Sequence, residues 1–218
     1  MKKAKKILVL ALSACLLVAV TIGATVAYLT DTKTVNNTFT VGNVKIKLDE
    51  AVAEYDSASN TWKATNARTD EGQSYKLLPG TVVEKDPTVT VLAKSEDCYV
   101  RALITVTNKE ALDKIFAEHD LLLGNVIGGI STDWTVAAAG TPDGDTRVYE
   151  VRYKSIVPAS TSDTVLDDIF ESITVPGDLN NTEIASLENL SITVVAQAIQ
   201  ADGFATAEAA WAAFAAAK

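Results

Sequence analysis

Short runs in which apolar and polar residues alternate recur along this 218-residue chain, and they constrain its fold more than any other feature. In the first run, Val44, Ile46 and Leu48 alternate with two lysines, which is the period of a half-buried strand. Similar runs occupy residues 60–65, 87–94, 98–107, 133–138, 146–157, 171–175 and 190–200. Turn-forming pairs such as Pro79–Gly80 and Pro176–Gly177 separate them. The sequence therefore predicts a mainly β protein, a jelly-roll-like β-sandwich.

A few short helices are expected beside the strands. Residues 108–122 begin with a candidate N-cap and place apolar residues on one helical face. Residues 163–170 predict a shorter helix with three inward-facing side chains, those of Leu166, Ile169 and Phe170. The Ala-rich end of the chain, residues 205–218, predicts a third helix, because alanine has the highest helix propensity. We expect its two aromatic residues, Trp211 and Phe214, to pin it to the sandwich.

The connections between strands carry further expectations. Two polar stretches, residues 53–62 and 137–146, are predicted to be loops. Pro87 stands at the start of a strand, where the missing N–H of proline is tolerated. Lys45 and Lys47 are typical of an edge strand protected against uncontrolled pairing.

The first 27 residues have the pattern of a secretory signal peptide. Four lysines within residues 2–6 precede an uncharged stretch, which ends in small residues up to Ala27. We expect cleavage between Ala27 and Tyr28, which leaves residues 28–218 as a single β-sandwich domain with an N-terminal arm at 28–40. Two alternatives stay open: an uncleaved membrane anchor and a lipoprotein attached through Cys15. If cleavage occurs, the protein contacts the membrane only before it.

Charge and cysteine content exclude several classes of function. The net charge is −9, and it becomes more negative when the signal lysines are removed. An acidic surface repels phosphate backbones, so nucleic acid is excluded as a partner. Cys98 is the only cysteine of residues 28–218, so no disulfide can form within that domain. Its place in an apolar strand pattern indicates a small buried side chain.

The residues that catalysis requires are scarce. His119 is the only histidine, so neither a two-histidine zinc motif nor a histidine-based serine triad can be built. The acids Asp167, Asp168 and Glu171 are interpreted as a helix N-terminus rather than a catalytic pair. We therefore expect no enzyme activity, no metal and no cofactor, although the sequence leaves open a Ca²⁺ site near the pair Asp143 and Asp145.

Three segments resemble one known family. The stretch "GATVAYLTDTKTVNNTFTVGNVKIKL" is similar to the processing region of exported bacterial proteins that are cut by a SipW-type signal peptidase. The segments "LLPGTVVEKDPTVTV" with "CYVRALITVTN", and "LSITVVAQAIQADGFATAEAAW", resemble later blocks of the TasA/camelysin family in the same order. The resemblance implies a jelly roll, a secreted location at the cell surface or in the biofilm matrix, and a fibre-forming role. Camelysin relatives are often labelled metallopeptidases, a label that the residues do not support.

The leading hypothesis is a secreted structural subunit that forms a homopolymer, with itself as partner, by donating its N-terminal strand. We predict Tyr28, Leu29, Val35 and Phe39 as the donor residues, because β-branched and aromatic residues favour a strand. A monomeric surface adhesin is the first alternative, with the tryptophans Trp62 and Trp134 as contact candidates. A camelysin-like secreted metallopeptidase is the second.

Overall fold

The computed structural model describes residues 43–76, 78–108, 127–187 and 190–216. These residues belong to one compact unit of the chain, Gly42–Lys218. The element bounds are β1 Ile46–Asp56, β2 Thr61–Thr69, β3 Val82–Glu84, β4 Thr88–Val91, β5 Cys98–Val106, β6 Ile127–Gly128, β7 Trp134–Asp143, β8 Thr146–Tyr153, β9 Thr164–Val165, β10 Ser172–Thr174, α4 Asn181–Ser186, β11 Ile192–Gln200 and α5 Ala207–Ala216.

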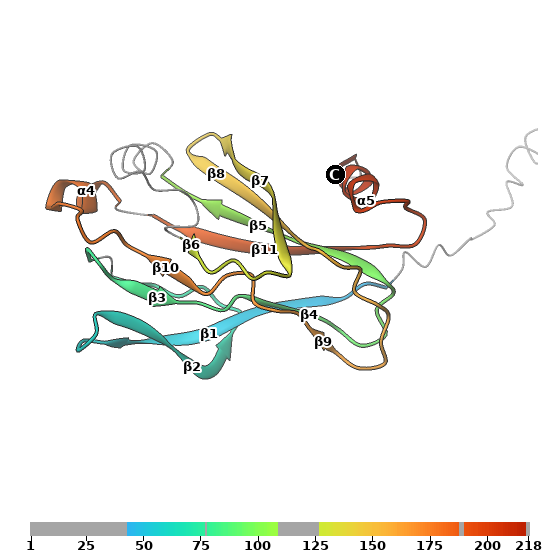
Figure 1. Ribbon diagram of the computed structural model, residues 1–218, viewed down its shortest axis with the longest axis horizontal. Helices are drawn as coiled ribbons and strands as arrows, with labels where there is room; N and C mark the ends of the chain where they lie inside the picture. The colour runs from blue at the N-terminus through green and yellow to red at the C-terminus, as the bar shows by residue number, and fades with distance from the viewer. Residues whose placement is uncertain (1–42, 77, 109–126, 188–189, 217–218) are drawn as a thin grey trace, which may run out of the picture. The chain divides into compact units, whose positions relative to one another are not determined.

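The strands form two sheets that pack face to face (Figure 1). One sheet has seven strands in the order β6-β10-β3-β2-β1-β4-β9, and the other has four in the order β11-β5-β8-β7. The core lies between them, and it combines Val89 and Val91 of the first sheet with Val100, Ala102 and Ile104 of the second. Alternate residues of β5 are fully buried, as the period-2 pattern requires. The predicted mainly β, two-sheet fold with few short helices is confirmed.

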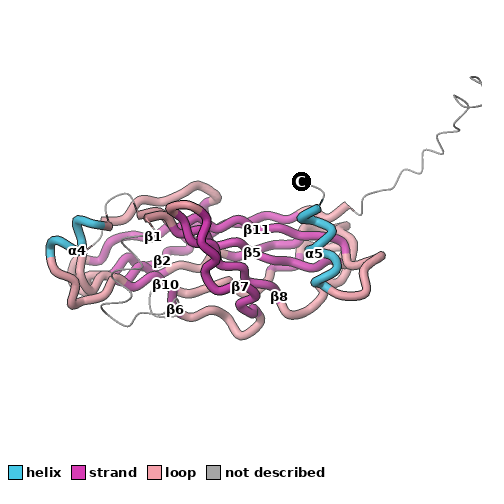
Figure 2. The backbone as a smooth tube through the Cα atoms, turned by 90° about the horizontal axis from the view of Figure 1, so that it is seen from above, coloured by secondary structure: helices cyan, strands magenta, loops and turns pink. Residues whose placement is uncertain are grey.

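The helix α5 lies across the outer face of the four-stranded sheet (Figure 2). Thr206 begins it, with its hydroxyl oxygen accepting a hydrogen bond from Ala209 N at 3.2 Å. Ala210 and Trp211 face the sheet and are buried. The Trp211 and Phe214 rings meet edge to face, with 5.7 Å between their centres. The buried Trp211 side chain thus attaches the helix to the sheet, and the small Ala210 side chain next to it leaves room for this contact.

The helix expected at 163–170 is not formed. Residues Thr164–Val165 are the short strand β9, and the segment after it continues as extended chain along the sheet. Its backbone hydrogen-bonds to β4 and to the residue before it: Leu166 N donates to Val89 O, and Ile169 N donates to Pro87 O, both at 2.9 Å. Leu166, Ile169 and Phe170 are all buried, so their inward direction was predicted correctly although the helix was wrong. Pairing with a distant strand outweighed the local helical spacing.

Two other expectations about connections need correction. Residues 137–143 are not a loop but part of β7, which pairs with β8 down to Asp143 and Thr146. The predicted loop at 53–62 shrinks to a turn at 57–60, since β1 continues to Asp56. Lys47 lies in the part of β1, Ile46–Asp49, that pairs with β4 alone, because β2 pairs with β1 only from Glu50 onward. Among the described residues, one side of this part therefore has no strand partner, and edge protection by Lys45 and Lys47 stays a prediction; Lys47 also forms an ion pair with Asp49 at 2.5 Å.

The helix α4 was not predicted, although its start carries a recognisable signal. The Asn180 side chain accepts hydrogen bonds from Thr182 N and Glu183 N, and the Glu183 side chain accepts one from Asn180 N. This reciprocal arrangement is a capping box. The spacing of Asn180 and Glu183 could have identified the helix. The other predicted helix, at 108–122, lies almost wholly outside the described residues.

Candidate functional site

The strand β11 stands at one edge of the four-stranded sheet. Over its full length it pairs with β5, from Ile192 opposite Val106 to Gln200 opposite Cys98. No other strand among the described residues pairs with its outer side. An edge strand of this kind presents N–H and C=O groups that a further strand can use. This nine-residue edge is long enough to accept an additional strand.

A groove of about 840 Å³ runs beside the first half of β11. The residues that line it belong to β1, β3, β10, α4 and β11 and to the segments next to them. Eight of the 22 residues that line its walls have large aliphatic side chains, and several of these eight belong to the partly buried margin of the core. These aliphatic residues are Leu48, Val83, Ile173, Ile184, Leu187, Leu190, Ile192 and Val194. The groove therefore offers apolar contacts next to a row of backbone hydrogen-bonding groups.

The residues of β11 divide between two faces. Ile192 and Val194 line the groove and are half-buried. Thr193 and Val195 are exposed, with 45% of the Val195 side chain open to solvent. This alternation follows from the pleat of the strand. If a strand were added at this edge, its apolar side chains could lie beside Ile192 and Val194 and continue the apolar side of the sheet.

A polar cluster lies at one end of the groove, formed by Glu50, Gln73, Tyr75 and Lys85. Lys85 Nζ donates to Glu50 Oε1 and, at 3.0 Å, to the Tyr75 hydroxyl. Gln73 Nε2 donates to the same Glu50 oxygen at 2.8 Å. Burial raises the pKa of Tyr75, and the neighbouring Lys85 acts in the opposite direction. The phenol is therefore neutral at physiological pH and available as a hydrogen-bonding group.

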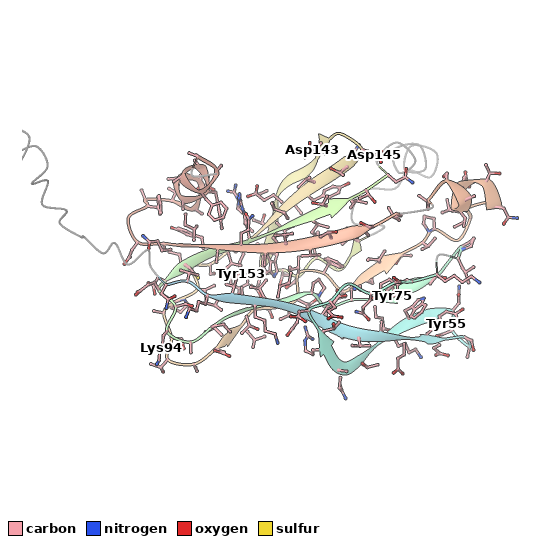
Figure 3. The ribbon with its side chains drawn as sticks, turned by 180° about the vertical axis from the view of Figure 1, so that it is seen from behind. Tyr55, Tyr75, Lys94, Asp143, Asp145 and Tyr153 are labelled. Carbon is pink, nitrogen blue, oxygen red and sulfur yellow. The ribbon has the colours of Figure 1, made fainter. Side chains whose placement is uncertain are left out.

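Tyr75 also belongs to an aromatic cluster at this end of the seven-stranded sheet. The Trp62 ring lies 5.2 Å from the Tyr55 ring and 5.2 Å from the Tyr75 ring, measured between centres. Tyr55 is 44% exposed. Figure 3 shows Tyr55 and Tyr75 at the same end of the sheet. Trp62 is thus half-buried between two tyrosines rather than displayed alone in a loop.

A second network of charged residues, formed by Arg68, Asp49 and Asp86, contacts β1 near Glu50. Arg68 Nε donates to Asp49 Oδ1 at 2.7 Å, and Arg68 Nη1 donates to Asp86 Oδ2 at 2.5 Å. Asp86 in turn accepts a hydrogen bond from Ala51 N. Burial alone raises the pKa of Asp49, but hydrogen bonds from Lys47 and Arg68 outweigh it and hold the pKa below the usual value. The network fixes the β1 backbone where it passes the groove.

The remaining predicted site residues have different positions. Ala27, Tyr28, Leu29, Val35 and Phe39 lie outside the described residues, as does His119. Trp134 is 3% exposed and donates from Nε1 to Asp167 O at 3.0 Å, so it belongs to the core. Cys98 is fully buried, and burial raises its pKa to about 11.

Asp143 and Asp145 lie at the tip of the β7–β8 hairpin (Figure 3). The turn between the strands is Gly144–Asp145, and Gly144 has φ of +57° at its first position. A positive φ at this position favours glycine and is typical of a type II′ hairpin turn. Within the described part of the chain, no three His, Cys, Asp or Glu side chains are grouped so that they could hold a metal ion. The same residues contain no helix with the length and apolar character needed to cross a membrane.

Sequence reasoning found neither the groove nor the polar cluster. Glu50 and Lys85 stand in strand-like patterns among other charged residues and carry no local signal. The edge position of β11 is a property of strand order, which alternation along one segment does not report.

Comparison with known families gives one match. The sequence model of the camelysin metallo-endopeptidase family matches residues 2–55. Searches of curated proteins and of solved structures found no match. The matched segment contains the predicted signal peptide, the predicted arm and β1. Over residues 2–55 the chain is thus similar to the camelysin family, a similarity that the motifs of this segment predicted.

Proposed function

We propose that this protein is an exported structural subunit of the cell surface or extracellular matrix, which assembles into fibres by strand addition. The N-terminal arm of one copy, residues 28–40, would pair with the outer edge of β11 in the next copy. The observation that carries this proposal is an edge strand beside an apolar groove on the same molecule. Camelysin-family similarity over the arm supports its role in an exported protein.

The arm has the length and pattern that this role requires. An extended strand over residues 28–40 is about 43 Å long, because a strand rises about 3.3 Å per residue. The arm is therefore longer than β11, which has nine residues, and it can cover the whole edge of that strand. Leu29, Val35 and Phe39 share one face of an extended strand, since side chains alternate between faces. This face would enter the groove, while Tyr28 would lie on the opposite face.

The geometry of such a contact favours a filament. The arm and the β11 edge are different surfaces, so each copy can donate to one neighbour and accept from another. A head-to-tail contact that does not close produces an open chain of subunits. Cleavage between Ala27 and Tyr28 by a SipW-type signal peptidase would free the arm and start assembly outside the membrane.

The first test removes the donor. Secreted protein lacking residues 28–37 should remain a folded monomer and form no filaments in electron microscopy. Because it keeps the β11 edge, it should also cap growing filaments and shorten those of the intact protein when the two are mixed. Filaments of normal abundance from the truncated protein would contradict strand donation.

The second test alters the acceptor with a matched control on the neighbouring residue. Val194→Glu places a charge in the groove, whereas Val195→Glu places the same charge on the exposed face of β11. We expect Val194→Glu to reduce filament formation strongly and Val195→Glu to leave it unchanged. Circular dichroism of both variants checks that the sheets are intact. Equal assembly of both variants would show that the groove is not the acceptor.

A secreted metallopeptidase is the competing function, because the matched family is described as a metallo-endopeptidase. Turnover of a protein substrate that a chelator blocks would support it. His119→Ala is the direct test, since this is the only histidine of the chain. We expect this substitution to leave assembly unchanged. Loss of a measured proteolytic activity in His119→Ala would favour the peptidase.

A further inference from the structure

One carboxylate oxygen connects an amine and an amide at the polar end of the groove. Glu50 Oε1 accepts hydrogen bonds from Lys85 Nζ and, at 2.8 Å, from Gln73 Nε2. The Lys85 side chain is 8% exposed and that of Glu50 is 18% exposed, so both charged groups are largely shielded from water. A base is therefore placed between a nucleophile and the leaving group of an amide, within hydrogen-bonding reach of both.

The amide of Gln73 is held by the backbone of β1. Its Oε1 accepts a hydrogen bond from Ala53 N at 2.9 Å, and its Nε2 donates to Ala51 O at 2.9 Å. The pairing of β1 with β2 is irregular between Ala51 and Ala53, and this irregularity leaves these groups free to bind a side chain. A hydrogen bond to the carbonyl oxygen polarises the amide and stabilises negative charge that develops there.

Lys85 is fixed from three sides. Its backbone N–H donates to Glu171 O at 2.8 Å, and its Nζ donates to the Tyr75 hydroxyl. The Nζ atom also lies 5.1 Å from the centre of the Tyr75 ring. These contacts hold the amine against Glu50 Oε1, the atom to which Gln73 Nε2 also donates. Proximity of this kind can lower the barrier of a reaction between two groups.

We propose that Lys85 and Gln73 become joined by an intramolecular isopeptide bond, with Glu50 as the catalytic acid–base. Glu50 takes a proton from the Lys85 ammonium, and the free amine attacks Cδ of Gln73. The oxygen of the tetrahedral intermediate stays hydrogen-bonded to Ala53 N–H. Glu50 then transfers protons from the lysine nitrogen to Nε2 as the Cδ–Nε2 bond breaks. Two protons in all pass from the lysine to the departing nitrogen, which leaves as ammonium, and no oxidant or other reactant is needed.

The bond would join the segment after β2 to the residue that follows β3. It would close a covalent loop within one subunit and fix the wall of the groove on the side of Tyr75. The reaction occurs inside one chain, so it does not depend on filament formation. The plain alternative is that the three groups form only an ion pair with an adjoining hydrogen bond.

Intact-mass measurement separates these two cases. We expect the secreted protein to be lighter than its processed sequence by one ammonia molecule. Fragmentation of a proteolytic digest should then yield a branched peptide that joins Lys85 to Gln73. The branched peptide is decisive, because dehydration or cyclisation elsewhere would not produce it. A folded protein that has the full mass and yields separate, unmodified Lys85 and Gln73 peptides would overturn the proposal.

A pair of variants tests the role of Glu50. Glu50→Gln should stop the reaction and restore the full mass, whereas Glu54→Gln, the same change at an exposed position of β1, should keep the mass loss. Lys85→Arg should also restore the full mass, because a guanidinium is not a nucleophile at this pH. Circular dichroism confirms that each variant is folded. A branched peptide at normal yield in Glu50→Gln would remove Glu50 from the mechanism.

Discussion

The guanidinium of Arg101, on the outer face of the four-stranded sheet, lies 4.3 Å from the ring centre of Trp211 in α5. Arg101 Nε also donates to Gln197 Oε1 of β11 at 2.9 Å, and its Nη1 contacts Glu150 Oε1 of β8 at 3.3 Å. One arginine therefore connects the C-terminal helix with three strands. Stacking of a guanidinium on an indole ring adds attraction to the apolar burial of the ring.

This relationship predicts how α5 detaches. Trp211→Ala should lower the free energy of unfolding by about 3–5 kcal/mol, because it removes a buried aromatic side chain. If α5 unfolds locally first, the variant should be cut by proteases near residue 205 while the sheets stay folded. Urea denaturation and limited proteolysis measure the two effects.

Arg101→Lys serves as the partner experiment. It keeps the positive charge but removes both the planar group that stacks on Trp211 and the guanidinium contacts to Gln197 and Glu150, so we expect a smaller loss of about 1 kcal/mol. A loss for Arg101→Lys as large as that for Trp211→Ala would show that the contacts of Arg101 contribute as much as burial of the Trp211 ring.

Cys98 predicts a protected thiol. It is fully buried, and burial raises its pKa to about 11, with the nearby Asp97 acting in the same direction. Only the thiolate reacts with thiol reagents, so native protein at pH 8 should be labelled very slowly. Addition of denaturant should make labelling fast and complete. Rapid labelling of the native secreted protein would mean that β5 opens frequently at this end.

The Asp49–Arg68 contact predicts sensitivity to acid. The pKa of Asp49 is lower in the folded protein than its ordinary value of 3.8. Its contribution to stability is therefore present above pH 3.8 and is lost as the pH falls through the lower folded-state pKa. Asp49→Asn should cost about 2 kcal/mol near neutral pH, since hydrogen bonds to charged groups are the stronger kind. The difference from the original protein should shrink in acid, as measured by urea denaturation across the pH range.

Processing makes a prediction of its own. The secreted protein should begin at Tyr28, with Thr25 and Ala27 as the small residues before the cut. N-terminal sequencing and intact mass measure this directly. A secreted form that retains residues 7–22, or one that carries lipid on Cys15, would instead support one of the two alternatives.

The sequence by itself determined several of the longer strands, among them β5 and β11, and which of their faces are buried. The alternation in β5 and in the first half of β1 is visible in the chain, because the pleat directs successive side chains to opposite sides. The alanine-rich run that becomes α5 could likewise be predicted, since helix propensity is a local property. Even at 163–170, where the helix was wrong, the three buried residues were correctly identified.

The tertiary structure alone decided the order of the strands, and with it the candidate site. The strand β11 carries no sequence signal of an edge strand, yet it forms the edge of the four-stranded sheet beside the groove. Glu50, Gln73 and Lys85 come together only because the segment after β2 folds back over β1. Such contacts depend on pairings between distant segments, whose free energy reflects the whole sheet, and a local pattern of residues does not contain that information.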